Sequence, residues 1–563
     1  MSKVGKFSKL ITKDLSNGAA RAMLYGANFK KKDFDKNIIG IGSMYYELNP
    51  CNKHLGKLQN LVKTNSVNTM KTVIFNTIGV SDGITNGNSG MKYSLPSREL
   101  ITDSIETMIN AHHLDGFILI PGCDKNLPAS MMAMGRINRP SILLYGGTIL
   151  PGNFKGNDVD IVDAFESYGK LINNNITHSE RENLLKVCCH KDGGSCSGMY
   201  TCNTMATISE VMGLSLPYSS STPANSIDKV KETKVITKYL DNLITSNINP
   251  RDIIKKESFI NAIKLTTILG GSTNSIIHLL AIAKEFDIEL KLKEWNDINN
   301  DLPILANLKP HGKYSMYDIY KIGGLPIILK YLIKNDIIYG DLLTVSGKTI
   351  NENLIDVPDI NFDQDVFCDI KNPFKEDTHI KILFGNLSPF GSVAKISSDK
   401  KYFKGIAQVF ENEDDMINAL ENHKIKENTA IIIRNQGPKG GPGMPEMLKP
   451  SSALVGYGLE NVALITDGRW SGGSCGFLIG HIAPEAFDNG PISRVKNGDV
   501  IEIDLNKLTL NNLNYKKNSE YSNPSWLKYR SIEISNNYLY SDVDGYLKKY
   551  RKLVGNASTG CTT

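Results

Sequence analysis

Phe117–Tyr145 reads FILIPGCDKNLPASMMAMGRINRPSILLY, and this stretch indicates the fold of the first part of the chain. The apolar run Phe117–Ile120 predicts a short buried strand, and Ser141–Tyr145 predicts a second one. The residues after the polar loop PGCDKN predict a helix between them. A strand, a helix and a strand at this spacing are typical of a parallel βαβ unit. Ligands bind such sheets beyond the carboxyl ends of the strands, which is where the cysteine, aspartate and lysine of the loop fall.

Three further apolar runs share this design, because each leads into a Gly-rich polar loop. They are Val73–Ile78 before GVSDGITNG, Ala430–Ile433 before RNQGPKGGPGMPEM, and Val462–Ile465 before TDGRWSGGSCG. Ser97–His113 has apolar residues at helical spacing and predicts an amphipathic helix. Asn225–Pro250 is rich in Asn and Lys and predicts a helical excursion on the surface.

The pattern changes after about Asp356, where helical periodicity thins and short β-type runs such as HIKILF, SVAKIS and VIEIDL alternate with turn residues. We therefore expect an α/β protein of two domains. Residues 1–360 would form an α/β domain with a parallel βαβ sheet flanked by helices. Residues 361–563 would form a β-rich, barrel-like domain.

The composition argues against several classes of protein. The 563 residues suffice for two or more domains with a large core. The net charge of +5 is small and the basic residues are scattered, so we expect neither nucleic acid nor a membrane surface as a partner. The sequence has no run of 18 apolar residues that would predict a transmembrane helix. Its start has no apolar signal region and carries acidic residues early, which predicts a cytoplasmic protein.

The nine cysteines are an odd number in a long chain without a secretory signal, which favours reduced thiols over a disulfide framework. Cys51, Cys123 and Cys196 each lie in a turn-rich polar context. Three such thiolates would suit an iron–sulfur cluster with one iron left open as a Lewis acid. The absence of a Cys-x-x-Cys pair disfavours structural zinc. The simpler interpretation, which composition alone favours, is that these thiols are small buried core residues.

Carboxylates form a second theme. Asp82, Asp124 and Glu446 all lie in loops after strand-like runs, and oxygen ligands grouped in this way suit Mg²⁺. The alternative is that an aspartate in a Gly-rich loop only caps a turn or a helix. Asp124 stands next to Cys123, so that one loop would serve a soft metal and a hard metal together. This adjacency shifts the balance towards metal binding.

CDKNLPASMMAMGRINRPSILLYGG and ALITDGRWSGGSCGFLIGHIAPEA strongly resemble the two signature segments of the dihydroxyacid dehydratase family. This family also contains phosphogluconate and sugar-acid dehydratases. NPCNKHL, GSCSGMYTCNTM and LGGSTNSIIHLLAIA resemble further family segments in the family's order, so the resemblance covers nearly the whole chain. This resemblance outweighs the simpler interpretations, in which the thiols are buried core residues and the aspartates only cap a turn or a helix. GMKYSLPSRE is more similar to the branched-chain biosynthetic members than to the phosphogluconate enzymes.

The resemblance implies that 2,3-dihydroxy-3-methylbutanoate and 2,3-dihydroxy-3-methylpentanoate are dehydrated to 2-keto acids, the precursors of valine and isoleucine. It also implies a homodimer with the site near the interface. Two other functions stay open. A sugar-acid dehydratase of the same fold would act on aldonates, and an iron–sulfur electron carrier would have no use for the Mg²⁺-type carboxylates.

The same resemblance assigns roles to eight residues. Lys125 would react with CO₂ and bind Mg²⁺ as a carbamate, because a bare ammonium repels the metal. Ser471 would be the catalytic base, for which the alternative is a serine that caps a turn or a helix. The cluster ligands would be Cys51, Cys123 and Cys196, and the Mg²⁺ ligands would be Asp82, Asp124, Lys125 and Glu446.

Two features of the sequence predict the type of cluster. Family members with a [4Fe–4S] cluster resemble C-P-T-C-G-S-C before GM and lack the Cys of NPCN. Here Cys51 is present, and Gly193 stands three residues before Cys196. We therefore expect a [2Fe–2S] cluster, with [4Fe–4S] as the alternative. The stretch CCHKDGGSC departs from the spacing that is usual in the family before the third cluster cysteine. The roles of Cys188 and Cys189 therefore stay open.

Overall fold

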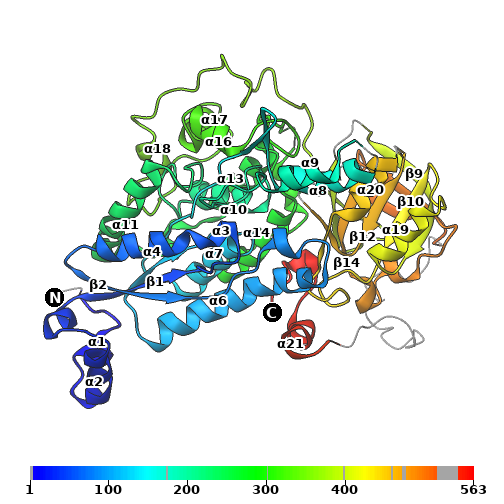
Figure 1. Cartoon of the computed structure of the whole chain (residues 1–563). Helices are drawn as coiled ribbons and strands as arrows, with labels where there is room; N and C mark the ends of the chain where they lie inside the picture. Colours follow the sequence, from blue (N-terminus) through cyan, green and yellow to red (C-terminus); the bar gives the residue numbers. More distant parts are fainter. Residues whose placement is uncertain are drawn as a thin grey trace.

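The computed structural model shows two bodies side by side, a helical N-terminal one around a small sheet and a β-rich C-terminal one (Figure 1). The predicted α/β fold class, with a barrel-like C-terminal region, is confirmed. The structure describes residues 4–172, 175–300, 302–396, 400–457, 459, 461–471, 477–515 and 543–563.

The N-terminal sheet has four parallel strands in the order β2-β1-β3-β4. Three of these strands were predicted, with small differences in their bounds. The chain moves from β1 to β2 in one direction and from β2 through β3 to β4 in the other. Because such crossovers are right-handed, the helices of the two steps lie on opposite faces of the sheet. The strands are β1 (Asn37–Ser43), β2 (Met70–Asn76), β3 (Gly116–Ile120) and β4 (Ser141–Leu143).

The central strand β1 was missed by the sequence analysis. Its sequence NIIGIGS contains two glycines, which weaken a β pattern. The structure shows why small residues fit, because a Cβ on Gly42 would lie 2.8 Å from side-chain atoms of Leu119 and Phe75. All seven residues of β1 are buried.

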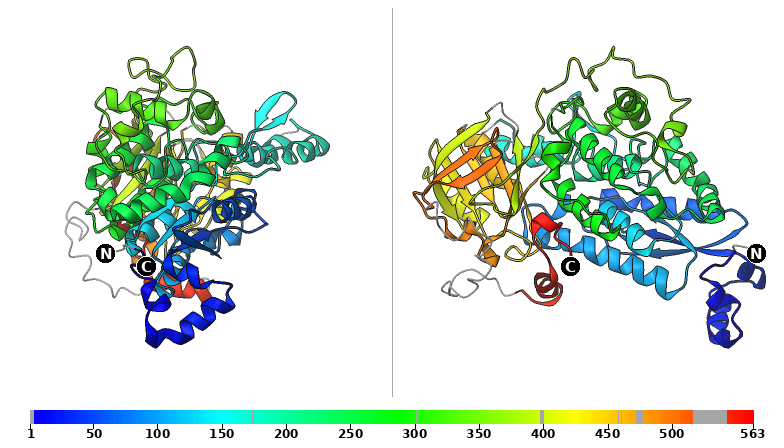
Figure 2. Two further views of the ribbon diagram at one scale, coloured as in Figure 1. Left: turned by 90° about the vertical axis from the view of Figure 1, so that its left-hand side faces the viewer. Right: turned by 180° about the vertical axis from the view of Figure 1, so that it is seen from behind.

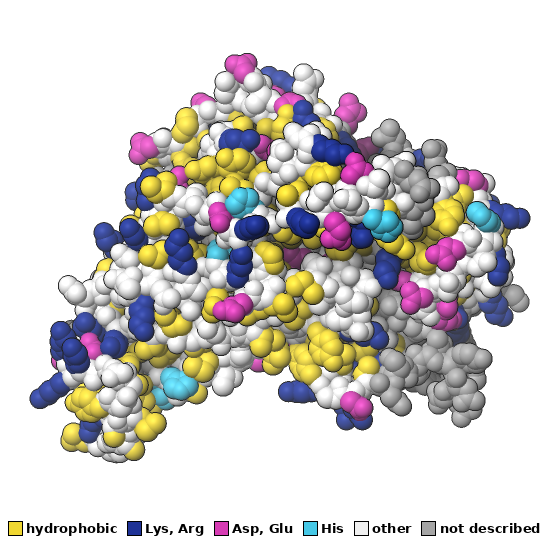
Figure 3. Space-filling model, in the orientation of Figure 1, with side chains coloured by type: hydrophobic (Ala, Val, Ile, Leu, Met, Phe, Trp, Pro, Cys, Tyr) yellow, Lys and Arg dark blue, Asp and Glu magenta, His cyan; other side chains and the backbone are white. Residues whose placement is uncertain are grey.

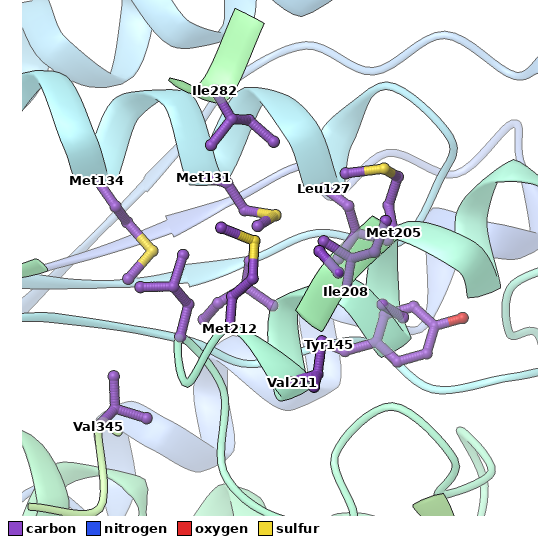
Figure 4. Close-up of a cluster of buried hydrophobic side chains, with 14 of the residues drawn as sticks. Leu127, Met131, Met134, Tyr145, Met205, Ile208, Val211, Met212, Ile282 and Val345 are labelled. Atoms are coloured by element: carbon purple, nitrogen blue, oxygen red, sulfur yellow. The ribbon is translucent and has the colours of Figure 1, made fainter. Parts of the chain in front are cut away.

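Helices α6 (Ser94–Ala111) and α7 (Asn126–Ile137) confirm the two predicted helices and pack against each other. Figure 1 shows α6 and α4 (Leu55–Thr64) on opposite sides of the sheet, as the crossover rule requires. The face of α7 away from the sheet is covered by further helices. In Figure 4, Leu127, Met131 and Met134 of α7 lie near Met205, Ile208 and Ile282 in one continuous apolar core. The covering helices are α10 (Thr201–Val211), α13 (Lys256–Ile268) and α14 (Asn274–Glu285).

The predicted surface excursion was wrong in one respect. Residues 225–250 do form a long helix, α11 (Ile227–Ser246), but α11 packs against α4 instead of standing apart. Ile236 and Leu240 are fully buried in the main core. The polar composition misled the prediction, because a helix needs only one apolar stripe to pack.

Two projections leave the N-terminal body. Figure 2 shows α1 (Lys9–Thr12) and α2 (Gly18–Gly26) extending away from it. The pair α8 (Ile161–Ile172) and α9 (His178–Leu185) forms the second projection, and α8 contacts α20 (Lys449–Tyr457) of the C-terminal body. The helix α8 therefore bridges the two halves of the molecule.

The C-terminal body is built on a mixed eight-stranded sheet in the order β16-β15-β9-β10-β12-β14-β8-β7. Phe384, just after β7, pairs with Thr509 of β16, so the outer strands meet and the sheet nearly closes. The runs HIKILF, SVAKIS and VIEIDL correspond to β7, β8 and β15. The strands are β7 (Ile380–Leu383), β8 (Gly391–Ile396), β9 (Tyr402–Phe410), β10 (Thr429–Ile433), β12 (Ala463–Thr466), β14 (Phe477–Ala483), β15 (Val500–Asp504) and β16 (Thr509–Asn512).

The end of the chain returns to the junction between the two bodies, where Figure 1 places the C-terminus. Cys561 packs with Leu95, Ile277 and Met444 from both halves. On the face shown in Figure 3, acidic and basic side chains are interspersed, in agreement with the scattered charge of the sequence. Within the described ranges, each helix is too short or too polar to cross a bilayer.

Candidate metal centre and active site

The predicted site residues come together at the carboxyl end of the N-terminal sheet, where the C-terminal body adjoins it. One cavity of about 220 Å³ is lined by all of them except Lys125. The Lys125 side chain is fully buried and donates a hydrogen bond to Asp82 of the cavity wall. The residues that line the cavity are Cys51, Cys123, Cys196, Asp82, Asp124, Glu446 and Ser471.

Backbone contacts bring the first two cysteines together. Cys51 lies in the first turn of α3 (Pro50–Lys53), and its N–H donates to the capping side chain of Asn49 over 3.4 Å. The loop after β3 crosses this turn at Gly122, where a Cβ would lie 2.1 Å from the carbonyl oxygen of Cys51. Only glycine allows this close approach. The approach places Cys123 beside Cys51.

The third cysteine is placed by two glycines with positive φ. Gly193 and Gly194 have φ values of 84° and 126°, a conformation that side chains disfavour. The N–H of Gly194 donates to the carbonyl oxygen of Pro50 over 3.1 Å, which ties this loop to α3. Cys196, two residues further on, therefore reaches the other two thiols.

The three thiols are close enough to change one another's protonation. Hydrogen bonds with Cys123 and Cys196, together with burial, raise the pKa of Cys51 well above its usual value. The hydrogen bond with Cys51 lowers the pKa of Cys123. Cys51 and Cys123 therefore titrate as a coupled pair, as expected of two thiols in direct contact.

Cys188 and Cys189 differ in their surroundings. Cys188 packs against Val159 and Leu184, and its burial raises its pKa to about 12. Both cysteines line the cavity, and for Cys189 burial together with the charge of Cys196 raises the pKa to about 11. Cys202 is a core residue of α10, and Cys475 lies outside the described residues.

We expect Cys188→Ser and Cys189→Ser to retain their iron and sulfide, because the other three thiols already converge without them. Both thiols line the cavity, but the Cys189 variant is the stricter test, since the charge of Cys196 acts on the Cys189 thiol. Iron and sulfide analysis after anaerobic reconstitution measures the outcome. Loss of iron in the Cys189 variant alone would make that residue a ligand, while Cys188→Ser serves as the matched control.

The three carboxylates form a compact group. Asp82, Asp124 and Glu446 are buried, and one oxygen of each lies within 4.8 Å of the others. Ser94 donates to Asp82 over 2.7 Å and fixes that carboxylate. Burial and the nearby charge of Asp82 raise the pKa of Asp124 well above its usual value. A group of carboxylates that disfavours its own ionisation is relieved by a divalent cation.

Lys125 lies at the centre of this group. Its Nζ is bonded to Asp82 and lies 3.8 Å from Glu446 and 4.0 Å from Asp124. Burial lowers its pKa, but the three carboxylates outweigh burial and raise the pKa above the usual value. Burial likewise raises the pKa of Asp82, while Lys125 and then Arg469 bring it below its usual value. The Lys125 side chain is therefore an ammonium ion, and it lies at a position where it would compete with a metal ion for the carboxylates.

A two-stranded element positions Glu446 and Ser471. Strand β11 (Glu446–Met447) pairs in parallel with β13 (Arg469–Trp470). Arg469 Nη1 donates to Glu446 Oε1 over 2.7 Å, and the N–H of Ser471 donates to the carbonyl oxygen of Met447 over 2.9 Å. The C-terminal body thus contributes Glu446 and Ser471 to a cavity whose cysteines come from the N-terminal body.

The sequence analysis missed several partners of these residues. Asn274 donates to Glu446 and, over 3.0 Å, to Thr201, so it orients the carboxylate from α14. Arg469 stands two residues before Ser471 in the signature TDGRWSGG. This position in the sequence could have indicated that Arg469 belongs to the site. Asn274 lies in the family-like segment LGGSTNSIIHLLAIA, but nothing in its spacing points to Glu446. His481, in the segment GHIAPEA, is buried, and burial lowers its pKa to about 3.

In this α/β protein three thiols and three carboxylates converge on one cavity, and the carboxylates form a group that could hold a metal ion. The family models described as dihydroxy-acid/6-phosphogluconate dehydratase N-terminal and C-terminal match residues 36–353 and 365–561. The chain belongs to this family, whose members are dehydratases and hence hydro-lyases.

Similar proteins are related over their full length. A protein of Francisella tularensis subsp. novicida (strain U112) named dihydroxy-acid dehydratase is 48% identical, with 100% of both chains covered. The mitochondrial dihydroxy-acid dehydratase of Saccharomyces cerevisiae is 46% identical over 99% of this chain and 96% of its own length. The chloroplastic dihydroxy-acid dehydratase of Arabidopsis thaliana is 47% identical over 100% of this chain and 91% of its own.

Proposed function

We propose that this chain dehydrates 2,3-dihydroxy-3-methylbutanoate and 2,3-dihydroxy-3-methylpentanoate to their 2-keto acids. These keto acids are the precursors of valine and isoleucine. The observation that carries this proposal is the cavity in which Ser471, three thiols and three carboxylates meet, in a chain related at full length to dihydroxy-acid dehydratases. A sugar-acid dehydratase is the second candidate.

The wall of the cavity favours the branched substrates. Apolar side chains from α8 and from the adjoining loops line it beside the metal-type ligands. A methyl or ethyl group at C3 would be buried against this wall, whereas the hydroxyls of an aldonate would lose hydrogen bonds with water there. The apolar residues are Ile84, Ile149, Ile161, Val162, Phe165 and Leu448.

The donor sets fit two different cofactors. The three thiolates would hold a [2Fe–2S] cluster with one position open, and Asp82, Asp124, Glu446 and Lys125 as a carbamate would hold Mg²⁺. When bound, these groups supply Lewis acids for the departing C3 hydroxyl and for the substrate's carboxylate and C2 hydroxyl. The convergence of soft sulfur and hard oxygen donors on one cavity supports this division.

The chain's own residues would hold the substrate and move one proton. Ser471 is fixed through its N–H to Met447, so its Oγ can take the proton from C2 as a general base. Arg469 neutralises part of the charge on Glu446, which keeps this carboxylate from repelling the anionic substrate. The resulting enol then tautomerises to the keto acid.

The test of the function is an anaerobic assay of 2-keto acid formation on the two branched dihydroxy acids and on a panel of aldonates. We expect kcat/KM to be at least about tenfold higher for the branched acids, because burying one or two methyl groups contributes about 1–3 kcal/mol. Turnover of an aldonate at an equal or higher kcat/KM would replace this proposal with the sugar-acid alternative.

We expect Ser471→Ala to lower kcat by about 10²–10⁴-fold, the usual cost of losing a general base. The iron content and Mg²⁺ binding should stay unchanged, because the serine hydroxyl is not among the proposed ligands. Steady-state kinetics and metal analysis on the same preparation measure both. Ser451→Ala, a buried serine that donates to the carbonyl oxygen of Leu448, is the matched control and should retain its kcat. An unchanged kcat in Ser471→Ala would assign the C2 proton to another group.

We also propose a homodimer in the cytoplasm and a division of the chain into residues 1–360 and 361–563. The gap between the two family models, at residues 354–364, supports this boundary. Strands β7 and β8 nevertheless contribute Ile380, Ile382 and Val393 to the N-terminal core, so the two parts share packing across it.

A further inference from the structure

Several buried polar atoms near Lys125 have no hydrogen-bond partner within the described part of the chain. They include Nε2 of His278 and Nη2 of Arg469, and both side chains are fully buried. Buried polar groups are nearly always satisfied, since leaving one unpaired costs free energy. The charge of Lys125 acts on His278, and the charge of Arg469 acts on Lys125, so the two unpaired groups share one buried neighbourhood and point to a missing hydrogen-bonding partner.

Both unpaired groups are donors. Nδ1 of His278 lies 3.2 Å from Nη1 of Arg98, and a guanidinium only donates, so Nδ1 accepts and Nε2 carries the hydrogen. Burial and the charges of Arg98 and Lys125 hold the pKa of His278 well below its usual range, so the ring is neutral. Arg469 uses Nε on the carbonyl oxygen of Met444 over 2.6 Å and Nη1 on Glu446, which leaves Nη2 without a partner among the residues that the structure describes. The missing partner is thus an acceptor.

Both donors belong to elements that contact Glu446, the carboxylate 3.8 Å from Lys125 Nζ. Glu446 Oε1 accepts from Arg469 over 2.7 Å and lies 3.8 Å from Lys125 Nζ, so this one oxygen joins the arginine to the lysine. His278 projects from α14, the helix whose Asn274 also donates to Glu446. Asp82, Asp124 and Glu446 all line the cavity.

We propose that Arg469 and His278 bind the oxygens of a carbamate on Lys125 and so stabilise this modification. The inference rests on the proposed function, in which Lys125 reacts with CO₂. The neutral amine of Lys125 forms the N–C bond with its lone pair, and one C=O electron pair moves onto oxygen. The ammonium loses two protons in total, both to water in the cavity, and leaves an N–H and a carboxylate.

The charge balance explains why these donors are needed. Carbamylation replaces a cation by an anion beside three carboxylates, which is unfavourable without new partners. Mg²⁺ would balance part of this negative charge, while Arg469 and His278 would donate hydrogen bonds to the carbamate oxygens. A charge-assisted hydrogen bond to a buried anion changes an equilibrium by about 10- to 100-fold.

The experiment measures the carbamate itself. The full chain is prepared anaerobically with Mg²⁺ and titrated with ¹³C-labelled CO₂ and bicarbonate. Carbamate on Lys125 is read by ¹³C NMR and by chemical trapping followed by mass spectrometry of the peptide. His278→Asn keeps an acceptor toward Arg98 but removes the Nε2 donor, whereas His278→Gln places an amide donor near the Nε2 position. Arg469→Gln removes the guanidinium and tests the second donor independently.

We expect His278→Asn and Arg469→Gln to need about 10- to 100-fold more CO₂ for half-occupancy, with recovery in His278→Gln. A purely structural role would not give recovery by the glutamine. A carbamylated wild type whose variants keep the same CO₂ affinity would overturn this inference and leave the proposed function intact. A wild type without any carbamate would overturn the role of Lys125 in the proposed function and this inference with it. If one variant fails to fold, judged by its thermal unfolding, the substitution at the other donor decides.

Discussion

Lys125→Arg should abolish turnover while the chain stays folded. A guanidinium cannot form a carbamate and stays cationic, so the four proposed Mg²⁺ ligands would become three carboxylates facing a fixed positive charge. Losing metal-based stabilisation of the transition state costs several kcal/mol, which corresponds to a fall in kcat/KM of about 10³-fold or more. Steady-state kinetics and Mg²⁺ titration of the anaerobic protein measure the effect.

Lys229→Arg is the matched control. Lys229 is also fully buried, but its Nζ lies 2.7 Å from Glu232 and is not paired with the three carboxylates that surround Lys125. Its replacement tests whether a buried arginine in place of a lysine is harmful in itself, and we expect it to retain turnover. Full activity of Lys125→Arg would remove the carbamate from the proposed mechanism.

Cys51→Ala should empty the iron–sulfur site. Cys51 forms hydrogen bonds with both other thiols, so its loss leaves two ligands where a cluster with one open position needs three. Anaerobic reconstitution followed by iron and sulfide analysis should give about two irons per chain for the wild type and almost none for the variant. Activity should fall with the iron content.

Cys188→Ala controls for the removal of a buried thiol, because Cys188 lines the same cavity but packs in an apolar cluster with Val159 and Leu184. It should keep its iron. Mössbauer spectra of the wild type then identify the cluster, and about four irons per chain would contradict the [2Fe–2S] assignment. Cluster retention in Cys51→Ala would contradict the proposed ligand set.

The local patterns of the sequence predicted the parallel strands and their helices well. β3, α7 and β4 follow from apolar runs of the right length on either side of CDKN, because hydrophobic periodicity depends on neighbouring residues alone. The strand β1 was missed because its glycines weaken the pattern. Its need for glycine arises from Leu119 and Phe75, which are distant in sequence.

For the site, as for the fold, the sequence predicted one part and the tertiary structure decided the other. The family-like segments alone were enough to predict three cysteines, four Mg²⁺-type residues and Ser471 as one set, because the residue types and their loops are written in the sequence. Which atoms meet was decided only by the tertiary structure. Gly122 and the glycines before Cys196 bring the thiols together, and the pairing of β11 with β13 sets Arg469 against Glu446. The unpaired donors of His278 and Arg469 have no signal in the sequence, since a hydrogen bond left unmade exists only once the chain has folded around it.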